Sequence, residues 1–562
     1  MKKILWLSPP NFSGGLKSMT RKYLKRAGIN LTQVEFREYT ANCLYKRTKT
    51  IWETRPERKE HFFKQIDRKK YDLIVVNDKA ALHYITGKYL SLALTRGSIF
   101  KHGDTPVLVI DDVKKIKSTR TGGWIMLQDL GKLQRWLHGK QRVEPSFNYT
   151  VCRSVEDVRK LSISILNSIL SGIDIETTGT TISCIGYSNF QKDGTIQTFV
   201  VPFYNTTKPN GCHWETEEQE QEVWRLVKQI NSSLTYKVMQ NGSYDATYFT
   251  IYGVPLTNYW CDTLHSWHSI WAEAPKKLDF ISSIALDFYR YWKDEGKEDA
   301  DDNEPYAVPI THEGLENYWL YNALDCHNTV SSFRFIIQIL MHQDWAVRNY
   351  VSEFTRQFGV NFNMSMRGTK VNYEIHSQLL CDLTEEHEAA HKDLLHMVAD
   401  PEFNPNSDKQ VAELLYDILG ATQIPRKKRS VNEVVLKMIA TQDPLLDIVI
   451  EQIWKTKKPK NNVSKYGLNK VLHGRFMYKL NTATTPTGRL ASKAHDLWTG
   501  ANIQNIPKRM RVMFEPDPGY VLVDIDYSQS DEYFTAYETQ DLDFIATMQS
   551  GKIGRASCRE RV

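Results

Sequence analysis

Residues 172–176 read GIDIE, and they begin the stretch that decides the fold of the central part of this chain. Side chains of a β-strand point alternately to its two faces, so Asp174 and Glu176 share one face and the isoleucines share the other. Apolar runs at residues 182–187 and 196–201 follow and predict the next two strands of a meander. We therefore expect a sheet that buries one face and presents two acids on the other.

The paired acids predict a metal site. Two adjacent carboxylates repel each other unless cations lie between them, and Mg²⁺ prefers oxygen ligands. Two further elements carry polar groups. Residues 240–245, QNGSYD, follow the strand-like run 236–239 and precede a predicted helix. Within a later helical stretch, the i,i+4 spacing of Tyr321 and Asp325 places both on one helix face, where a phenol and a carboxylate can together orient a water molecule.

These elements, in this order, resemble the DEDDy group of 3′–5′ exonucleases, which includes the proofreading domain of family A DNA polymerases. The resemblance spans about residues 160–340 and implies a ribonuclease H-like fold with two bound metal ions, Mg²⁺ or alternatively Mn²⁺. The acids at the metal-binding positions of that group are Asp174, Glu176, Asp245 and Asp325. The resemblance also implies that Tyr321 positions the attacking water and that Asn241 helps to hold the substrate strand. The implied reaction is in-line attack of a metal-bound hydroxide on the terminal phosphodiester. Asp262 lies in a matching CDTL stretch without a defined role.

A second set of motifs lies near the end of the chain. Residues 487–490 read TGRL, residues 504–507 read QNIP and residues 526–529 read DYSQ. Their order and spacing resemble the opening of the polymerase core in family A DNA polymerases, the bacterial polymerase I class. A complete member of that family continues for a few hundred residues beyond this point. We therefore expect a C-terminally truncated polymerase.

The same resemblance assigns roles to single residues of the polymerase core. Asp526 follows an apolar, strand-like run that begins near Tyr520, and it matches one of the two carboxylates that hold the polymerisation metals. The residues that match contacts to the primer–template duplex are Arg489, Gln504 and Asn505. Arg509 matches a basic position near the phosphates of the incoming nucleotide. Asp531 takes the place of a glutamate that packs against the nucleotide sugar, and the shorter acid weakens the expected discrimination against ribonucleotides.

Two departures from the family pattern complete this interpretation. The second metal-binding carboxylate and the nucleotide-binding helix of the family have no matching segment, so the chain as given is not expected to extend a primer. Glu532 and Tyr533 stand where the family usually has leucine and arginine, and this divergence favours a phage-encoded polymerase.

Residues 350–470 resemble the helical thumb of the same family. Ser407 is expected to cap a helix, since its hydroxyl can accept a hydrogen bond from a free backbone N–H of the first turn. Basic runs at residues 426–429 and 455–460 are usually solvated when they occur alone, but in a thumb they would contact phosphates without reading sequence. Further helices are expected at residues 431–439 and 445–455.

The N-terminal part predicts a separate small α/β domain with a parallel sheet. Strand-like runs there alternate with helical stretches. Residues 72–80, 96–100 and 106–110 resemble the sheet-and-loop pattern of uracil-DNA glycosylase-like domains. Residues 111–113, DDV, stand where that family has a His-Pro-Ser loop, so the resemblance implies an inactive relative that binds DNA or a partner. An unrelated small α/β domain is the alternative.

The fold expected for the whole chain is α/β and multidomain. The 562 residues are enough for three or more domains. We expect an α/β domain at 1–140, a linker near 141–148, an exonuclease domain at 150–345, a thumb and polymerase start at 350–515, and a partial palm at 516–550. Residues 551–562, GKIGRASCRERV, do not resemble the family and are interpreted as a non-native tail, with a genuine short basic tail as the alternative.

Composition limits the remaining function classes. The net charge of +6 does not by itself indicate nucleic-acid binding. Eight cysteines without a C-x-x-C pair indicate neither a disulfide framework nor a zinc site. The first residues are too short an apolar run for a signal peptide or a membrane span. We expect a protein of the reducing cytoplasm, the host cytoplasm if the source is a phage, that does not bind membranes.

The sequence thus predicts a DNA replication protein, a family A DNA-directed DNA polymerase with a metal-dependent 3′–5′ exonuclease. Its expected partners are DNA primer–template and single-stranded 3′ ends, with deoxynucleotides only for the full-length protein. One alternative is a stand-alone 3′–5′ exonuclease of the ribonuclease D type, which the thumb and palm motifs disfavour. The other is a catalytically inactive DNA-binding protein, which the matching acids and tyrosine disfavour.

Overall fold

The structure is a computed structural model, and it divides into two compact units. The first comprises Met1–Gly368 with Met477–Asn505, and the second comprises Thr369–Phe476 with Ile506–Val562. The described residues are 2–9, 12–38, 66, 71–88, 90–293, 308–425, 429–527 and 529–550. The interpreted tail at 551–562 and most of the basic run at 426–429 therefore lie outside the described residues.

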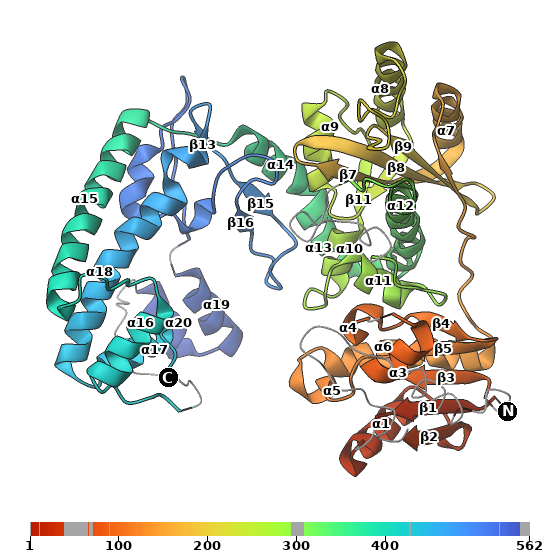
Figure 1. Ribbon diagram of the computed structural model, residues 1–562, viewed down its shortest axis with the longest axis horizontal. Coiled ribbons are helices and arrows are strands. Elements are labelled where there is room, and N and C mark those ends of the chain that lie inside the picture. Colours follow the sequence, from red (N-terminus) through yellow and green to blue (C-terminus); the bar gives the residue numbers. More distant parts are fainter. Residues whose placement is uncertain are drawn as a thin grey trace. The chain divides into compact units, whose positions relative to one another are not determined.

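The first unit begins with a five-stranded sheet of order β2-β1-β3-β5-β4 (Figure 1). Its strands are β1 Ile4–Ser8, β2 Val34–Glu38, β3 Leu73–Val76, β4 Ile99–His102 and β5 Thr105–Val109. The expected parallel pairing is found for β1, β2, β3 and β5, whereas β4 runs antiparallel to β5. The predicted parallel sheet is therefore confirmed for these four strands, and β4 is an antiparallel addition at the edge, because only two residues connect β4 to β5 and so short a connection joins antiparallel strands.

Helices cover both faces of this N-terminal sheet. They are α1 Gly14–Arg26, α3 Lys79–Thr86, α4 Leu92–Thr95, α5 Lys115–Ser118 and α6 Gly122–His138. Leu24 of α1 and Leu130 of α6 belong to the core on one face, and Leu82 of α3 and Leu92 of α4 belong to the core on the other. Burial on both faces explains why these strands are continuous apolar runs.

The centre of the first unit is a six-stranded sheet of order β11-β10-β7-β8-β9-β6. Its strands are β6 Tyr149–Val151, β7 Ser168–Thr178, β8 Thr181–Gln191, β9 Ile196–Pro202, β10 Tyr236–Met239 and β11 Tyr259–Asp262. β7, β8 and β9 form the predicted antiparallel meander. β10 runs parallel to β7, and β11 runs parallel to β10.

Helices lie on both faces of the central sheet, and Figure 1 shows α7 and α8 on one side of β7–β9 and α12 on the other. The helices of this part are α7 Val155–Asn167, α8 Glu217–Asn231, α9 Ser243–Ile251, α10 Thr263–Ile270, α11 Leu278–Ala285 and α12 His312–Met341. Ile173 and Ile175 enter the core on the side of α7 and α8. The acids of the same strand therefore face α12, as their alternation predicts.

Two glycines allow α12 to approach the sheet closely. A Cβ atom on Gly186 of β8 would lie 2.5 Å from Asn322 Oδ1 and 2.5 Å from Cys326 Sγ. A Cβ atom on Gly172 of β7 would lie 2.5 Å from Val330 Cγ2. Because a real Cβ atom does not approach other atoms so closely, side chains at these positions would push the helix away from the acids on β7.

The rest of the first unit adds helices and a small hairpin beyond the central sheet. These elements are α13 Asp344–Tyr350, α14 Phe358–Arg367, β15 Lys479–Asn481 and β16 Ala491–Lys493. β15 and β16 pair antiparallel, so residues 477–505 return to the first unit although they follow most of the second in sequence.

The second unit is mainly helical, as the sequence predicts for this region. Its helices are α15 Tyr373–Val398, α16 Asp408–Ala412, α17 Glu433–Ala440, α18 Pro444–Tyr466, α19 Ser530–Thr539 and α20 Leu542–Gln549. Its short strands are β12 Thr369–Lys370, β13 Val471–Leu472 and β14 Arg475–Phe476. The predicted cap is confirmed, because the side chain of Ser407 accepts a hydrogen bond from the backbone N–H of Gln410.

The strand predicted to begin near Tyr520 does not form. Residues 520–527 have no regular secondary structure, and Val521 and Val523 are 79% and 71% exposed. No strand among the described residues pairs with this segment. An isolated strand leaves its backbone N–H and C=O groups unpaired, so an apolar run without a neighbouring strand does not become a strand.

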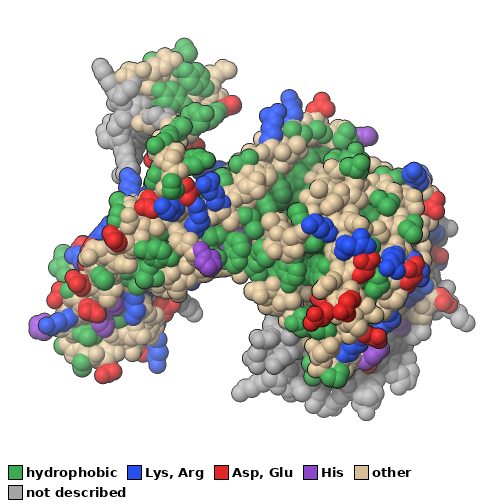
Figure 2. Space-filling model, turned by 90° about the horizontal axis from the view of Figure 1, so that it is seen from above, with side chains coloured by type: hydrophobic (Ala, Val, Ile, Leu, Met, Phe, Trp, Pro, Cys, Tyr) green, Lys and Arg blue, Asp and Glu red, His purple; other side chains and the backbone are tan. Residues whose placement is uncertain are grey.

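The charged side chains of the surface and the cysteines were also located in the structure. On the face seen in Figure 2, side chains of Lys and Arg are interspersed with those of Asp and Glu. The cysteines within the described residues are all free. No helix in the described part of the chain is both long and apolar enough to cross a membrane.

Candidate functional site

Three predicted acids meet where β7 faces α12. Asp174 and Glu176 come from β7 and Asp325 comes from α12. One ligand atom from each lies within 4.8 Å of the others. Among the described residues this is the one group of three or more His, Cys, Asp or Glu side chains so arranged. We call these three residues the carboxylate cluster.

Asp245, the fourth predicted acid, lies beside the carboxylate cluster but outside that group of three. It is buried in the first turn of α9. Its Oδ1 accepts a hydrogen bond from the backbone N–H of Ile175 at 2.9 Å, which ties α9 to β7 between the two acids of that strand. A role for Asp245 as a metal ligand stays a prediction.

The electrostatics of the cluster favour a bound cation. Burial raises the pKa of Asp174 well above its usual range, and the charges of Asp245, Asp325 and Glu176 raise it further. Burial and the charge of Asp325 raise the pKa of Glu176 to about 8. Burial raises the pKa of Asp245 to about 7. These carboxylates share a confined space, so their ionised forms need a positive charge nearby.

The donor set fits a hard divalent cation. Every ligand atom in the cluster is a carboxylate oxygen, which suits Mg²⁺ and Mn²⁺. Asn322, from the same helix as Asp325, donates from its side-chain nitrogen to Asp174 Oδ2 at 3.0 Å and so orients that acid. The other side-chain atom of Asn322, Oδ1, is buried and has no hydrogen-bond partner among the described residues. We therefore assign Asn322 as a positioning residue that sequence reasoning missed.

A tryptophan and a lysine also reach the cluster, and sequence reasoning missed both. Trp292 donates from Nε1 to Asp325 Oδ1 at 2.6 Å. Lys293 donates from Nζ to Asp325 Oδ2 and, at 3.0 Å, to the hydroxyl of Tyr321. Burial opposes the charge of Lys293, but the Asp325 carboxylate outweighs it and the pKa of this lysine is raised. The spacing of residues in the sequence does not predict this contact, because it depends on how the segment after α11 packs against α12.

The predicted one-sided arrangement of Tyr321 and Asp325 is confirmed. Both side chains contact the same ammonium group of Lys293 from successive turns of α12. The phenol therefore lies next to the carboxylate cluster, where it can contact a group that the cluster holds.

Asp262 shapes the loop that carries Asn241. Its carboxylate accepts hydrogen bonds from the backbone N–H groups of Asn241 at 3.2 Å and Gly242 at 2.9 Å. It also accepts one from the hydroxyl of Tyr259 at 2.6 Å and caps α10. Burial acts to raise the pKa of Asp262, but His265 and these hydrogen bonds outweigh burial and lower it. Asn241 is exposed and has a positive φ of 59°, a conformation that the Asp262 contacts support.

Two of the residues predicted for the polymerase core, Gln504 and Arg509, make side-chain contacts with other parts of the chain. Gln504 donates from its side chain to the carbonyl of Leu490 at 3.0 Å. Arg509 forms an ion pair with Glu386 of α15 at 2.6 Å. All six residues of the set are exposed, namely Arg489, Gln504, Asn505, Arg509, Asp526 and Asp531. No group of three metal-binding side chains among the described residues includes Asp526.

Part of this chain is similar in sequence to known proteins. Residues 374–552 match the family model of DNA polymerase family A. The thermostable DNA polymerase I of Thermus thermophilus is 29% identical over 204 residues, which are 34% of this chain and 23% of that protein. DNA polymerase I of Geobacillus stearothermophilus is 29% identical over 205 residues, which are 34% of this chain and 22% of that protein.

A longer alignment joins this chain to DNA polymerase I of Synechocystis sp., with 25% identity over 335 residues, 56% of this chain and 32% of that protein. The chain therefore spans a third or less of the length of these curated relatives.

A solved structure shares the fold. It is the POL domain of Pol1 from M. smegmatis, in complex with DNA primer-template and dNTP. The TM-score is 0.50 at 15% sequence identity, and the match covers 73% of this chain and 65% of that one. The protein is thus a multidomain α/β protein that resembles a DNA polymerase I POL domain, as the sequence predicts.

Proposed function

We propose that this chain is part of a DNA-directed DNA polymerase of family A and that its carboxylate cluster is a metal-dependent 3′–5′ exonuclease site. The polymerase assignment is supported by the family match at residues 374–552 and by the likeness to a POL domain. The same match disfavours a stand-alone exonuclease of the ribonuclease D type. A phage origin stays a prediction.

One observation carries the exonuclease assignment, namely the carboxylate cluster with a tyrosine one helical turn from one of its members. Asp174, Glu176 and Asp325 would hold the metal, and Asp245 is positioned to assist through Asp174. When bound, Mg²⁺ or Mn²⁺ supplies an activated water and neutralises charge on the phosphate.

The side chains around the cluster divide the remaining work. The hydroxyl of Tyr321 orients the attacking water, and the ammonium group of Lys293 fixes that hydroxyl relative to Asp325. Asn322 holds Asp174 in place. Asn241, on the loop shaped by Asp262, holds the substrate strand. We propose that the exonuclease domain extends from about residue 150 to about residue 345.

The polymerase residues keep their expected roles. Primer–template contacts are assigned to Arg489, Gln504 and Asn505, and nucleotide contacts to Arg509 and Asp531. Asp526 is assigned to metal binding. The match at residues 374–552 supports these roles because it includes all of these residues. To bind a phosphate, Arg509 must give up its ion pair with Glu386. Both side chains of this pair are exposed, so breaking it costs little free energy.

Replacement of one acid tests the exonuclease proposal. The change Asp174→Ala removes a central member of the cluster, and degradation of a single-stranded oligonucleotide labelled at its 5′ end should slow by orders of magnitude in Mg²⁺. The matched control is Glu217→Ala, an exposed acid of α8 in the same unit, which should leave the rate unchanged. Equal degradation by the parent and the Asp174→Ala variant would reject the assignment.

A further inference from the structure

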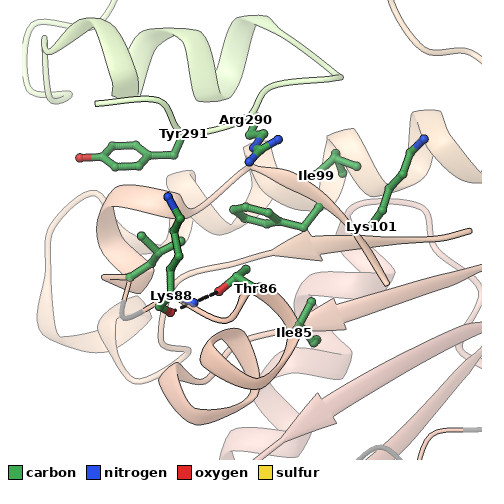
Figure 3. A pocket seen from close by; sticks show the side chains of 9 residues that line it. Ile85, Thr86, Lys88, Ile99, Lys101, Arg290 and Tyr291 are labelled. Atoms are coloured by element: carbon green, nitrogen blue, oxygen red, sulfur yellow. Dashed lines mark hydrogen bonds between the residues drawn. The ribbon is translucent and has the colours of Figure 1, made fainter. Parts of the chain in front are cut away.

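A basic cavity of about 530 Å³ lies where the N-terminal sheet meets the segment that follows α11 (Figure 3). Lys88 follows α3 and Lys101 belongs to β4, whereas Arg290 and Tyr291 belong to the segment after α11. Figure 3 shows Lys88 and Lys101 extending toward the side on which Arg290 and Tyr291 lie. Three cationic side chains from three separate parts of the chain therefore line one cavity.

The charge of the cavity has one sign. None of the described residues that line it is an aspartate or a glutamate. Lys88, Lys101 and Arg290 are all exposed, and no carboxylate among the described residues forms an ion pair with Lys101 or Arg290. Cationic groups arranged in this way attract the phosphates of a nucleic-acid strand.

The floor of the cavity is apolar and partly aromatic. Ile99 and Phe100 of β4 are half-buried, and Tyr291 also lines the cavity. Sugars and bases of a single strand can pack on such surfaces, because every base has an aromatic face. Cations beside apolar and aromatic side chains suit a phosphodiester strand better than they suit an inorganic anion.

The walls of the cavity are held together by hydrogen bonds. The backbone N–H of Ile99 donates to the carbonyl of Tyr289 at 2.8 Å, and that of Tyr291 donates to Ser98 Oγ at 3.2 Å. Further along, Arg135 of α6 binds Asp287 through hydrogen bonds of 2.6 and 2.8 Å. A cavity whose walls are fixed in this way loses little conformational freedom when a ligand binds.

The cavity is continuous in sequence with the carboxylate cluster. Arg290 and Tyr291 are followed directly by Trp292 and Lys293, which contact Asp325. Three peptide units separate Arg290 from Lys293, so their Cα atoms are at most about 11 Å apart. A strand of a few nucleotides can span this separation.

We infer that the basic cavity binds the sugar–phosphate backbone of a single DNA strand whose 3′ end lies at the carboxylate cluster. The location of the 3′ end rests on the proposed exonuclease function, whereas strand binding by the cavity does not. The inference also gives the N-terminal sheet a function, because that sheet supplies Lys88 and Lys101 to the binding of the substrate.

Binding of an oligonucleotide without metal tests the cavity alone. A fluorescent twelve-nucleotide single strand is titrated with the whole protein in EDTA, at several salt concentrations. The variant Lys88→Ala/Lys101→Ala/Arg290→Ala should bind at least tenfold more weakly. Its plot of log K against log salt should be shallower by about 2, since each lost phosphate contact on a single strand contributes about 0.7.

A charge-matched variant controls for net charge. Lys79, Lys117 and Lys192 are exposed, belong to the same unit and lie outside the cavity. Their simultaneous change to alanine should leave both affinity and salt slope close to those of the parent. Equal weakening in both triple variants, or in neither, overturns the inference. Competition by deoxythymidine monophosphate as effective as that by the oligonucleotide also overturns it, because the cavity then binds single nucleotides.

Degradation in Mg²⁺ connects the cavity to the cluster. The cavity variant should raise KM for the twelve-nucleotide strand with kcat unchanged. It should not change KM for a dinucleotide, whose one phosphodiester cannot occupy both places. A KM for the dinucleotide that rises equally contradicts the inference. If the parent degrades neither substrate, the proposed exonuclease function fails, while the EDTA titration still decides whether the cavity binds a strand.

Discussion

Tyr321 is the residue whose proposed role is separable from metal binding. Its hydroxyl accepts a hydrogen bond from Lys293 Nζ at 3.0 Å, and its proposed task is to orient water and not to bind metal. Tyr321→Phe should therefore slow hydrolysis by about 10²–10⁴-fold, the usual contribution of a group that positions or transfers a proton, without changing metal affinity. Single-turnover rates at saturating Mg²⁺ measure the first effect and calorimetry with Mn²⁺ measures the second.

Tyr318→Phe is the matched control, since Tyr318 lies on the same helix but bonds to Ser183 at 2.6 Å. The control should keep the parent rate. A Tyr321→Phe variant as fast as the parent at saturating metal contradicts the assigned role.

Lys293 places one positive charge against the carboxylate cluster, and this charge competes with a metal ion. Lys293→Met should bind Mn²⁺ about tenfold more tightly, since a like charge a few ångströms away costs on the order of 1–2 kcal/mol in a partly solvated site. The same variant should hydrolyse more slowly, because Tyr321 loses its anchor. Loss of fold would weaken both properties, so opposite changes in titration and rate identify the effect. Lys192→Met is the control, and weaker Mn²⁺ binding by Lys293→Met contradicts the account.

At the scale of residues, the sequence predicts what a local period determines. The alternation in β7 places Asp174 and Glu176 on one face, and the helical period places Tyr321 beside Asp325. Lys293 and Asn322 were not predicted. Their contacts depend on the path of the chain between elements and on the depth to which α12 packs, and neither leaves a period in the sequence.

At the scale of elements, the packing of α12 on β7 and β8 sets the geometry of the cluster. Gly186→Ala should destabilise the fold by about 1–3 kcal/mol, the usual cost of an extra methyl group in a packed interior, and should weaken Mn²⁺ binding. The reason is that the new Cβ atom would lie 2.5 Å from Asn322 Oδ1. Denaturant unfolding and calorimetry measure the two effects.

Gly359→Ala provides the control in α14, where an added Cβ atom meets nothing within 4 Å. This change should be neutral or stabilising by up to about 1 kcal/mol, because alanine favours a helix over glycine. A Gly186→Ala variant as stable as the parent would show that α12 is not held as closely as the structure indicates.

Helices and strands were predictable where the spacing of apolar residues matches the set of side chains that the element buries. The meander β7–β9 and the helices α17 and α18 lie where the apolar patterns predict them. The run that begins near Tyr520 was predicted as a strand, yet residues 520–527 are irregular and exposed. A strand depends on a partner strand, so apolar composition alone does not determine it. The antiparallel β4 was missed because the expectation of a parallel sheet ignored the two-residue connection to β5.

At the scale of the whole first unit, Lys132 joins the N-terminal sheet to the central part. Its ammonium group is buried and donates to the carbonyl of Gly97 at 2.6 Å and to that of Ser283 at 2.8 Å. Burial lowers the pKa of Lys132 to about 7, although the charges of Asp129, Asp287 and Glu144 oppose this and Arg96 assists it. In the unfolded chain the pKa of a lysine is about 10.4.

The pH dependence follows from this difference. Between pH 7 and 10 the unfolded chain binds more protons at Lys132 than the folded chain, so the free-energy cost of burying this lysine falls as pH rises, by up to about 1.4 kcal/mol per pH unit. The unfolding free energy of the parent minus that of Lys132→Met should therefore increase from pH 7 to pH 9, in the direction that favours the parent. Urea unfolding at the two pH values measures this signed difference, and a value that stays constant or decreases contradicts the prediction.

This junction was not predictable from the sequence. Residues 141–148 were interpreted as a linker, and they lack regular structure. Yet Arg142 donates to the carbonyls of Ile284 and Ala285, and Glu144 accepts from the backbone N–H of Phe288. Polar residues of a linker and of a domain contact look alike in sequence, because the difference depends on partners more than 140 residues away.

The location of a bound metal tests the central claim most directly. Crystals of the protein soaked in Mn²⁺ should show an anomalous scattering peak within about 2.5 Å of carboxylate oxygens of Asp174, Glu176 and Asp325. Crystals of the Asp174→Ala variant should lose that peak under the same conditions. A peak held by other side chains while these three carboxylates remain without one, at saturating Mn²⁺, would contradict the account.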